Sequence, residues 1–399
     1  MQNTVQAVFD HQPRPRLIFG AGVVARVGEL ARELGARRVL VVTDRGIVNA
    51  GHALRVEQAL QAAGLGVVVF AEVRENPTTR CVDQCARVAR AAEIDLIVGL
   101  GGGSSVDTAK GCNFILTNGG EMKDYWGIGK AAKPMLPLLA IPTTAGTGSE
   151  CQSFALIADE HTHQKMACGD PKAAAKIALL DPELTVSQPR RVTAGTGIDA
   201  IAHAVETAVT KKRNPLSLMY SHEAFKLCAG SFARVLEKPD DLAARGRMQL
   251  GAAFAGTAIE NSMLGAAHSA ANPLTAHYDI VHGQAVGMML PLVIRFNAVD
   301  PDALRCYAEL ASGPELATVK GGLTTALEAL LARLESLLNL AGFPRSLSDC
   351  GVEPAKINLL AEEAAKQWTV NFNPRRTSAA DFVGLYEGAF NRRSDGDLV

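Results

Sequence analysis

The sequence lacks any strong imbalance of charge. It holds 40 lysine and arginine residues against 41 aspartate and glutamate residues, which gives a formal net charge of −1. Proteins that bind nucleic acid through their electrostatic field carry a clustered excess of basic residues. We therefore expect no nucleic-acid partner for this chain.

Long apolar runs are absent as well. No segment approaches the ~18–20 apolar residues needed to cross a bilayer. The first residues, MQNTVQAVFDH, lack the basic and then apolar stretches of a secretory signal. The eight cysteines are scattered and form no Cys-x-x-Cys pair, which favours reduced, mostly buried thiols over a disulfide framework. We expect a cytoplasmic protein without a membrane partner.

The chain does contain enough apolar material for large folded cores. Its 399 residues correspond to the folded mass of two or three domains, and hydrophobic residues make up 48% of them. Apolar runs at 38–44, 65–70 and 94–100 alternate with helical patterns at 56–63 and 79–92. This alternation predicts a mostly parallel sheet, and continuous apolar runs predict strands covered by helices on both faces.

The pattern changes after Thr185. Stretches rich in alanine, leucine, glutamate and arginine then replace the strand-like runs, as at 323–340 and 354–367. Such stretches predict helices. We therefore expect an α/β nucleotide-binding domain over residues 1–186 and an all-α domain over residues 187–399.

A glycine-rich loop follows the strand expected at 94–100. Glycines let the backbone approach phosphate oxygens closely, and the N–H groups that begin the next helix can bind the anion. The loop is not the GxGxxG fingerprint, and an ordinary strand-to-helix turn is the alternative. The candidate phosphate-binding residues are Gly101, Gly102, Gly103, Ser104, Ser105 and Asp107.

A second polar loop, PTTAGTGSE at 142–150, follows the apolar run at 136–141. Its hydroxyl groups and glycines suit close contact with a ribose or a pyrophosphate, and a solvated turn is the alternative. The candidate cofactor contacts here are Thr143, Thr144 and Thr147.

Asp44 ends the strand expected at 38–44. A carboxylate at this point can accept hydrogen bonds from both hydroxyls of an adenosine ribose and would repel a 2′-phosphate. This indicates NAD rather than NADP. Aspartate is also a favoured helix N-cap, and the two roles can coexist.

Four residues of the second half have the chemistry of a metal site. Asp199 and His203 are four apart, so helical pitch places them on one face, and His268 and His282 follow in a second block. One carboxylate and three imidazoles can hold a divalent transition metal and leave a position open for substrate. The alternative is a surface contact for Asp199 and three ordinary buried histidines. The phosphate loop upstream favours the metal site.

These blocks together resemble the iron-containing, metal-dependent alcohol dehydrogenase family. Any one block is a weak signal, whereas the ordered set is highly specific and extends from about Phe19 to about Asn391. Besides the four candidate ligands, the matching segments are GGGSSVD at 101–107, PTTAGTGSE at 142–150, DPELT at 181–185, HGQAVG at 282–287 with Pro291, and NPR at 373–375.

The resemblance implies the dehydroquinate synthase-like fold of that family. An α/β nucleotide-binding domain with a mostly parallel sheet is then followed by an all-α metal-binding domain, with the site in the cleft between them. Asp199, His203, His268 and His282 correspond to the family's four metal ligands. The further residues that the resemblance implies are Asn76 near the nicotinamide, Lys165 at the cofactor ribose, and Phe154 and Ile259 at the substrate pocket.

One position departs from the family pattern. Family members often carry a histidine four residues after the third ligand, where this chain has Asn272. Asparagine does not titrate near neutral pH, so a proton path would use another group, such as His277, or water. Asn272 and His277 are therefore the candidate catalytic residues, and the departure affects the substrate class more than the redox chemistry.

The activity implied is reversible hydride transfer between a small, primary alcohol and NAD, giving the aldehyde. The metal acts as a Lewis acid on the alcohol oxygen, and the protein positions the nicotinamide against the substrate carbon. The family name favours Fe(II), with Zn(II) as the alternative, and the family expectation is a homodimer. The competing functions are a related polyol dehydrogenase or reductase on the same scaffold and a non-catalytic nucleotide-binding assembly protein.

Overall fold

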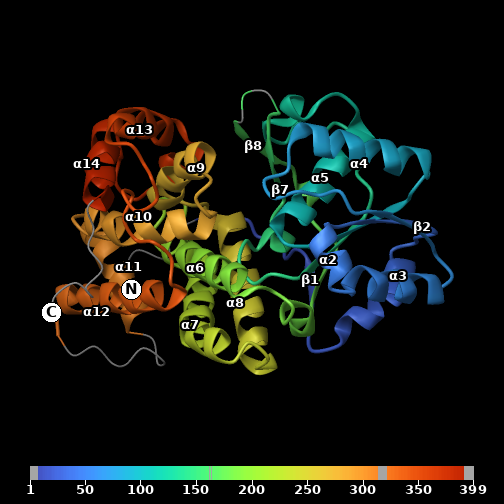
Figure 1. Ribbon diagram of the computed structural model, residues 1–399, viewed down its shortest axis with the longest axis horizontal. Helices are drawn as coiled ribbons and strands as arrows, with labels where there is room; N and C mark the ends of the chain where they lie inside the picture. The colour runs from blue at the N-terminus through green and yellow to red at the C-terminus, as the bar shows by residue number, and fades with distance from the viewer. Residues whose placement is uncertain (1–7, 161, 163, 313–320, 391–399) are drawn as a thin grey trace. The chain divides into compact units, whose positions relative to one another are not determined.

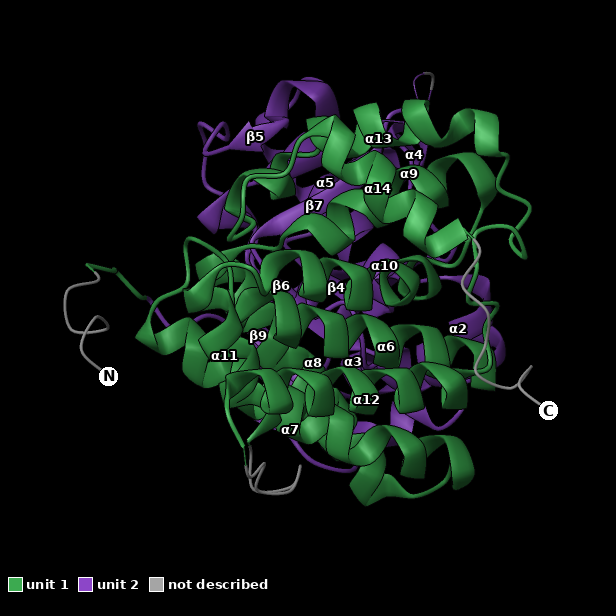
Figure 2. Ribbon diagram, turned by 90° about the vertical axis from the view of Figure 1, so that its left-hand side faces the viewer, with its two compact units in different colours: residues 1–11, 189–399 green, residues 12–188 purple. Residues whose placement is uncertain are grey.

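The computed structural model describes residues 8–160, 162, 164–312 and 321–390. It contains two compact units, coloured separately in Figure 2. Unit 2 is Gln12–Gln188, and unit 1 combines the chain before Gln12 with the chain from Pro189 onward. The expected assignment of residues 1–186 to a nucleotide-binding domain and of residues 187–399 to a metal-binding domain stays a prediction. Residues 1–7, on which the expected lack of a secretory signal partly rests, lie outside the described residues.

Unit 2 is built on a six-stranded sheet. Its strands are β1 (Arg16–Phe19), β2 (Arg38–Val42), β3 (Gly66–Phe70), β4 (Leu96–Gly101), β6 (Leu138–Pro142) and β9 (Ile177–Leu180). The order across the sheet is β1-β9-β6-β4-β2-β3, and every neighbouring pair is parallel. The mostly parallel sheet expected from the sequence is therefore confirmed.

Successive residues of β2 enter different hydrophobic cores. Val39 and Val41 pack in one cluster with α1 (Val27–Glu33) and α3 (His52–Ala62). Leu40 and Val42 pack in another cluster with α4 (Thr79–Ala91) and α5 (Gly103–Asn118), so the helices cover both faces (Figure 1). Because strand side chains alternate between faces, a strand covered twice must be apolar at every position. The helices of unit 2 are η2 (Val23–Arg26), α1 (Val27–Glu33), α2 (Arg45–Asn49), α3 (His52–Ala62), α4 (Thr79–Ala91), α5 (Gly103–Asn118), η3 (Met122–Tyr125), η4 (Ser149–Cys151), η5 (Pro171–Ala173) and η6 (Pro182–Thr185).

A second, three-stranded sheet in unit 2 was not expected from the sequence. It consists of β5 (Gly127–Ile128), β7 (Phe154–Ala158) and β8 (Lys165–Gly169), in the order β5-β8-β7. β8 pairs antiparallel with β7 and parallel with β5. β5 has only two residues, and β8 begins with a lysine and ends with a glycine, so neither strand shows a clear apolar run.

The described residues of unit 1 form helices joined by loops and no strand, as expected. Its longest described helix, α7 (Pro215–Glu237), begins with Pro215 directly after Asn214, whose side chain caps it. In the same way α11 (Pro301–Ala311) begins with Pro301 directly after the capping residue Asp300. None of the described helices has the length and hydropathy to cross a lipid bilayer. The helices are α6 (Arg190–Thr207), α7 (Pro215–Glu237), α8 (Leu242–Ser262), α9 (Ala266–Tyr278), α10 (His282–Asn297), α11 (Pro301–Ala311), α12 (Leu323–Ala341), η7 (Pro354–Lys356), α13 (Ile357–Lys366), η8 (Trp368–Phe372) and α14 (Ala379–Phe390).

The cysteines also match the expectation from the sequence. All eight are free thiols, and seven of them are buried. Cys81 and Cys85 lie one turn apart on the buried face of α4, so their spacing reflects helix packing.

Candidate functional site

The four candidate metal ligands come from three helices of unit 1. α6 carries Asp199 and His203 one turn apart, α9 carries His268 as its third residue, and α10 begins with His282. Both α6 and α9 pack against α10. Three helices that are separate in the sequence thus bring their polar side chains to one place.

The three imidazoles converge on one oxygen atom of Asp199. The Nε2 atoms of His268, His203 and His282 lie 3.3, 3.5 and 3.8 Å from Asp199 Oδ1. The ligand atoms of Asp199, His268 and His282 all lie within 4.8 Å of one another. Two donors bound to one ion at ~2.1 Å with a tetrahedral angle lie about 3.4 Å apart. The residues present therefore fit a divalent transition metal.

Close packing of backbone holds α10 against α6 beside this cluster. A Cβ atom added to Gly283 would lie 1.9 Å from the carbonyl oxygen of Gly195. Glycine at 283 therefore lets α10 approach α6 closely, immediately next to the ligand His282. The side chain of His282 is 30% exposed, whereas those of Asp199, His203 and His268 are buried, so the cluster is open on the side of α10.

Protons bound by histidine balance the negative charge of the carboxylates in this cluster. Burial raises the pKa of Asp199, but the charges of His203, His268 and His282 outweigh burial and hold it below the usual range. Burial lowers the pKa of His268, but Glu206 and Asp199 outweigh burial and raise it to about 9. Histidine binds metal as the neutral imidazole, so a cation entering this cluster takes the place of a proton.

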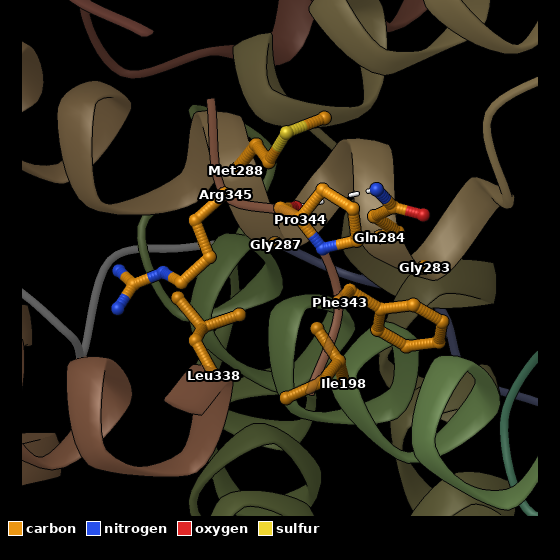
Figure 3. A pocket seen from close by; sticks show the side chains of 9 residues that line it. All are labelled: Ile198, Gly283, Gln284, Gly287, Met288, Leu338, Phe343, Pro344 and Arg345. Carbon is orange, nitrogen blue, oxygen red and sulfur yellow. Dashed lines mark hydrogen bonds between the residues drawn. The ribbon is translucent and has the colours of Figure 1, made fainter. Parts of the chain in front are cut away.

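A small pocket adjoins the same helices, but it is too small for an alcohol. Its lining includes Ile198 and Gly283, the sequence neighbours of Asp199 and His282, and Gln284, whose amide donates to the carbonyl of Pro344 at 3.2 Å (Figure 3). The cavity measures about 10 Å³, which is room for about one water molecule. We assign it no ligand.

In unit 2, the expected phosphate loops lie at the carboxyl ends of neighbouring strands. β4 ends at Gly101 and α5 begins at Gly103, while β6, which pairs with β4, ends at Pro142. The two loops touch, because Thr143 N–H donates to Gly101 O at 3.0 Å. Ligands of open parallel sheets bind at this edge.

The side chains of the second loop press against the glycines of the first. A Cβ atom at Gly102 would come within 3.2 Å of Thr144, and one at Gly103 within 2.8 Å of Thr147. Gly101 has φ +144°, and a Cβ there would meet Ser105 Oγ at 2.4 Å. Any larger residue would disturb both loops, which explains the run of three glycines. Their phosphate contacts stay a prediction.

Asp44 and Asn76 follow the strands β2 and β3 at the same sheet edge. Asp44 caps α2, its Oδ1 accepting the N–H of Ile47 at 3.0 Å, while Oδ2 would lie 3.4 Å from a Cβ atom at Gly101. The alternative N-cap role is therefore confirmed, and the ribose contact stays a prediction. Asn76 has φ +51° in the loop between β3 and α4.

Asp107 is occupied by protein contacts. It is buried, its Oδ1 accepts from Ser149 Oγ at 2.5 Å, and its Oδ2 accepts from Leu156 N–H at 3.2 Å. Lys110 Nζ lies 3.7 Å from Oδ1 and donates to Ser149 O and Phe154 O, each at 2.7 Å. This buried cluster ties α5 to the second loop. The contact between Asp107 and the cofactor stays a prediction.

The remaining candidates lie on several elements of the two units. Lys165 and Phe154 lie at opposite ends of the β7–β8 pair, and Ile259 is buried in α8. Asn272 donates to Gln367 Oε1 at 3.0 Å, and the half-exposed His277 bonds to Glu363 at 2.8 Å. The roles inferred from the resemblance for these five candidates stay predictions.

Glu206 and Lys110 are not among the site residues predicted from the sequence. Both were detectable, because Glu206 follows Asp199 and His203 at the next turn of one helix face, and Lys110 follows Asp107 by three. Each is a charged residue within the buried part of its helix.

Comparisons with known proteins identify the family. A model described as iron-containing alcohol dehydrogenase matches residues 13–182, and one described as Fe-containing alcohol dehydrogenase family, C-terminal, matches residues 193–390. The NAD-dependent methanol dehydrogenase of Bacillus methanolicus is 33% identical over 378 residues, which cover 94% of this chain and 98% of that protein.

Solved structures agree. A 1,3-propanediol oxidoreductase has a TM-score of 0.91 at 31% identity, covering 96% of this chain and all of that one. The sulfoacetaldehyde reductase of Bifidobacterium kashiwanohense, solved with NAD+, has a TM-score of 0.86 at 26% identity, covering 97% of this chain and all of that one. The expected fold is thereby confirmed. The chain belongs to the iron-containing alcohol dehydrogenase family.

Proposed function

We propose that this protein catalyses reversible hydride transfer between a small, primary alcohol and NAD, giving the aldehyde. As a member of its family it is an NAD-dependent, metal-containing oxidoreductase that interconverts alcohols and aldehydes. The small, primary character of the substrate is supported by relatives named for methanol, 1,3-propanediol and sulfoacetaldehyde, which are short molecules.

The observation that carries the proposal is the convergence of three imidazoles on Asp199 Oδ1. We assign Asp199, His203, His268 and His282 as the metal ligands. Nitrogen and oxygen donors accept Fe(II) and Zn(II), and family membership favours Fe(II). When bound, the metal supplies a Lewis acid that polarises the substrate oxygen.

The residues of unit 2 bind and orient the cofactor. The N-terminus of α5, with Ser104 and Ser105, offers N–H and O–H donors to the pyrophosphate. Asp44 accepts from the ribose hydroxyls and disfavours NADP. The other cofactor contacts in the proposal are Gly101, Gly102, Gly103, Asp107, Thr143, Thr144, Thr147, Asn76 and Lys165.

Further parts of the proposal rest on the resemblance of the motifs. Phe154 and Ile259 border the substrate, and a proton leaves through His277 or water because Asn272 cannot carry it. Residues 1–186 form the nucleotide-binding domain and residues 187–399 the metal-binding domain. We propose a cytoplasmic homodimer with no nucleic-acid or membrane partner.

The experiment is a set of assays on protein purified without oxygen. Metal-free protein is reloaded with Fe(II) or Zn(II) and supplied with NAD and a panel of short alcohols, and the absorbance of reduced nicotinamide is followed. We expect turnover that requires the added metal and is fastest with primary alcohols. If NAD and metal both bind but no alcohol or aldehyde reacts, the protein is a nucleotide-binding module and the proposal is wrong.

A further inference from the structure

We propose that Glu206 is a positioning residue that fixes the ring of His268 and the first turn of α9, so that His268 Nε2 faces the metal. The inference rests on the proposed function in one respect, the assignment of His268 as a metal ligand. Glu206 does not join the ligand group itself, because it bonds to the opposite ring nitrogen of His268.

Both oxygens of Glu206 are used. Oε2 lies 2.5 Å from Nδ1 of His268, and Oε1 accepts the backbone N–H of Ala267 at 2.7 Å. The side chain is 4% exposed, so water does not compete for these bonds. A carboxylate can only accept, so Nδ1 carries a ring proton, and Nε2, the atom that a metal would bind, lies on the other side of the ring, 3.3 Å from Asp199 Oδ1. A carboxylate behind a ligand histidine sets its tautomer and increases its basicity.

The same carboxylate supports the beginning of α9. The first N–H groups of a helix lack partners within the helix, and the N-cap of α9 is Gly265, which has no side chain to supply one. Asn373 Oδ1 accepts the N–H of Ala266 at 3.2 Å, and Glu206 accepts that of Ala267. A Cβ atom at residue 265 would lie 2.9 Å from Asn373 and 3.1 Å from Glu206. These two side chains therefore fill the space that the side chain of an N-cap residue would take and accept the N–H groups in its place.

One helix face therefore provides both the site and its support. Asp199, His203 and Glu206 lie on consecutive turns of α6. The first faces the metal position directly, and the last holds His268 from the other side of its ring. A negative charge near the N-terminus of α9 is also favoured by the helix dipole.

A glutamine at this position cannot make both bonds. If its amide group faces His268, it donates to Nδ1, and the ring proton moves to Nε2, where a metal must bind. If its carbonyl faces His268, the amide group meets the N–H of Ala267, and two donors oppose each other. Glu206→Gln therefore keeps the size of the side chain but prevents it from bonding to both His268 and Ala267.

The test compares Glu206→Gln and Glu206→Asp with Glu363→Gln. Glu363 is a matched control, because it bonds to the half-exposed His277 on the same helix, away from the histidine cluster. The metal-free variants are titrated with Co(II) and with Zn(II) against a competing chelator. The position of the Co(II) absorption bands reports the ligand field, which a merely partial loss of folded protein would not move.

We expect Glu206→Gln to weaken Zn(II) binding by about 10–100-fold and to shift the Co(II) bands. Glu206→Asp, which keeps the charge but is shorter, should lie between it and the unaltered protein, and Glu363→Gln should match the unaltered protein. If Glu206→Gln fails to fold, the Glu206→Asp variant decides. Unchanged affinity and bands in the folded Glu206 variants would overturn the inference. If the unaltered protein binds no metal, the proposed function fails instead.

Discussion

Gly283→Ala tests the packing that places His282 next to Asp199. The added methyl group would lie 1.9 Å from the carbonyl oxygen of Gly195, whereas real Cβ contacts stay beyond 3.0 Å. The backbones of α6 and α10 must therefore separate by about 1 Å. Overpacking costs about 1–3 kcal/mol, and because the obstacle is backbone, which cannot rotate away, we expect a loss near 3 kcal/mol.

The same shift should reach the metal. His282 precedes the altered residue and lies 3.8 Å from Asp199 Oδ1, so separating the helices carries one ligand away from the others. Metal sites tolerate distance errors of only about 0.2 Å. We expect Zn(II) affinity to fall about tenfold or more, as it does when support of a ligand is lost.

Gly384→Ala is the matched control. Gly384 lies inside α14, and a Cβ atom there would meet nothing within 4 Å. The substitution should stabilise the protein by about 0.5–1 kcal/mol, because alanine favours helix and restricts the unfolded chain. Urea unfolding of both metal-free variants and Zn(II) competition titrations give the two numbers. If Gly283→Ala matches the unaltered protein in both measurements, the close approach of the helices does not shape the site.

The remaining predictions concern the ligands, the cofactor and a buried acid. His268→Ala and His282→Ala should each lose metal and turnover but keep NAD affinity, and retained metal stoichiometry in metal analysis of both variants would contradict the assignment. Asp44→Ser keeps a capping oxygen but removes the charge, so steady-state kinetics should show the NADP-to-NAD ratio of kcat/KM rising by about tenfold, ~1.4 kcal/mol; an unchanged ratio would argue against the ribose contact. Burial raises the pKa of Glu150 from 4.5 to about 7. Because the folded state favours protonated Glu150, this group contributes on the order of 3 kcal/mol to the free energy of unfolding. The contribution is fully present below pH 4.5 and is lost as the pH rises through 7. Thermal unfolding should therefore show Glu150→Gln gaining stability relative to the unaltered protein between pH 5 and pH 8, and an equal difference at both pH values would refute the sign.

The sequence predicts the large sheet well for a physical reason. β2 and β4 are buried on both faces, so their sequences are unbroken apolar runs that stand out from their surroundings. β5 has only two residues, and the pairing of β8 with β5 joins distant segments. The hydrophobic periodicity of a segment does not indicate which distant strand it pairs with, so the small sheet could not be predicted.

The metal site likewise has one part that follows from local sequence spacing and another that depends on tertiary packing. The spacing of Asp199 and His203 places them on one helix face, which follows from helical pitch. The meeting of His268 and His282 with that face depends on how three helices pack, and only the ordered resemblance to a family indicated it before the structure. Glu206 could have been found from its spacing, but its bonds to His268 and to the start of α9 are tertiary contacts.

The most direct test is a crystal of the protein loaded with Fe(II) without oxygen and measured at the iron absorption edge. We predict one anomalous peak within bonding distance of the Asp199 carboxylate and of Nε2 in His203, His268 and His282. A peak at other residues, or none from protein that carries one equivalent of iron, would contradict it.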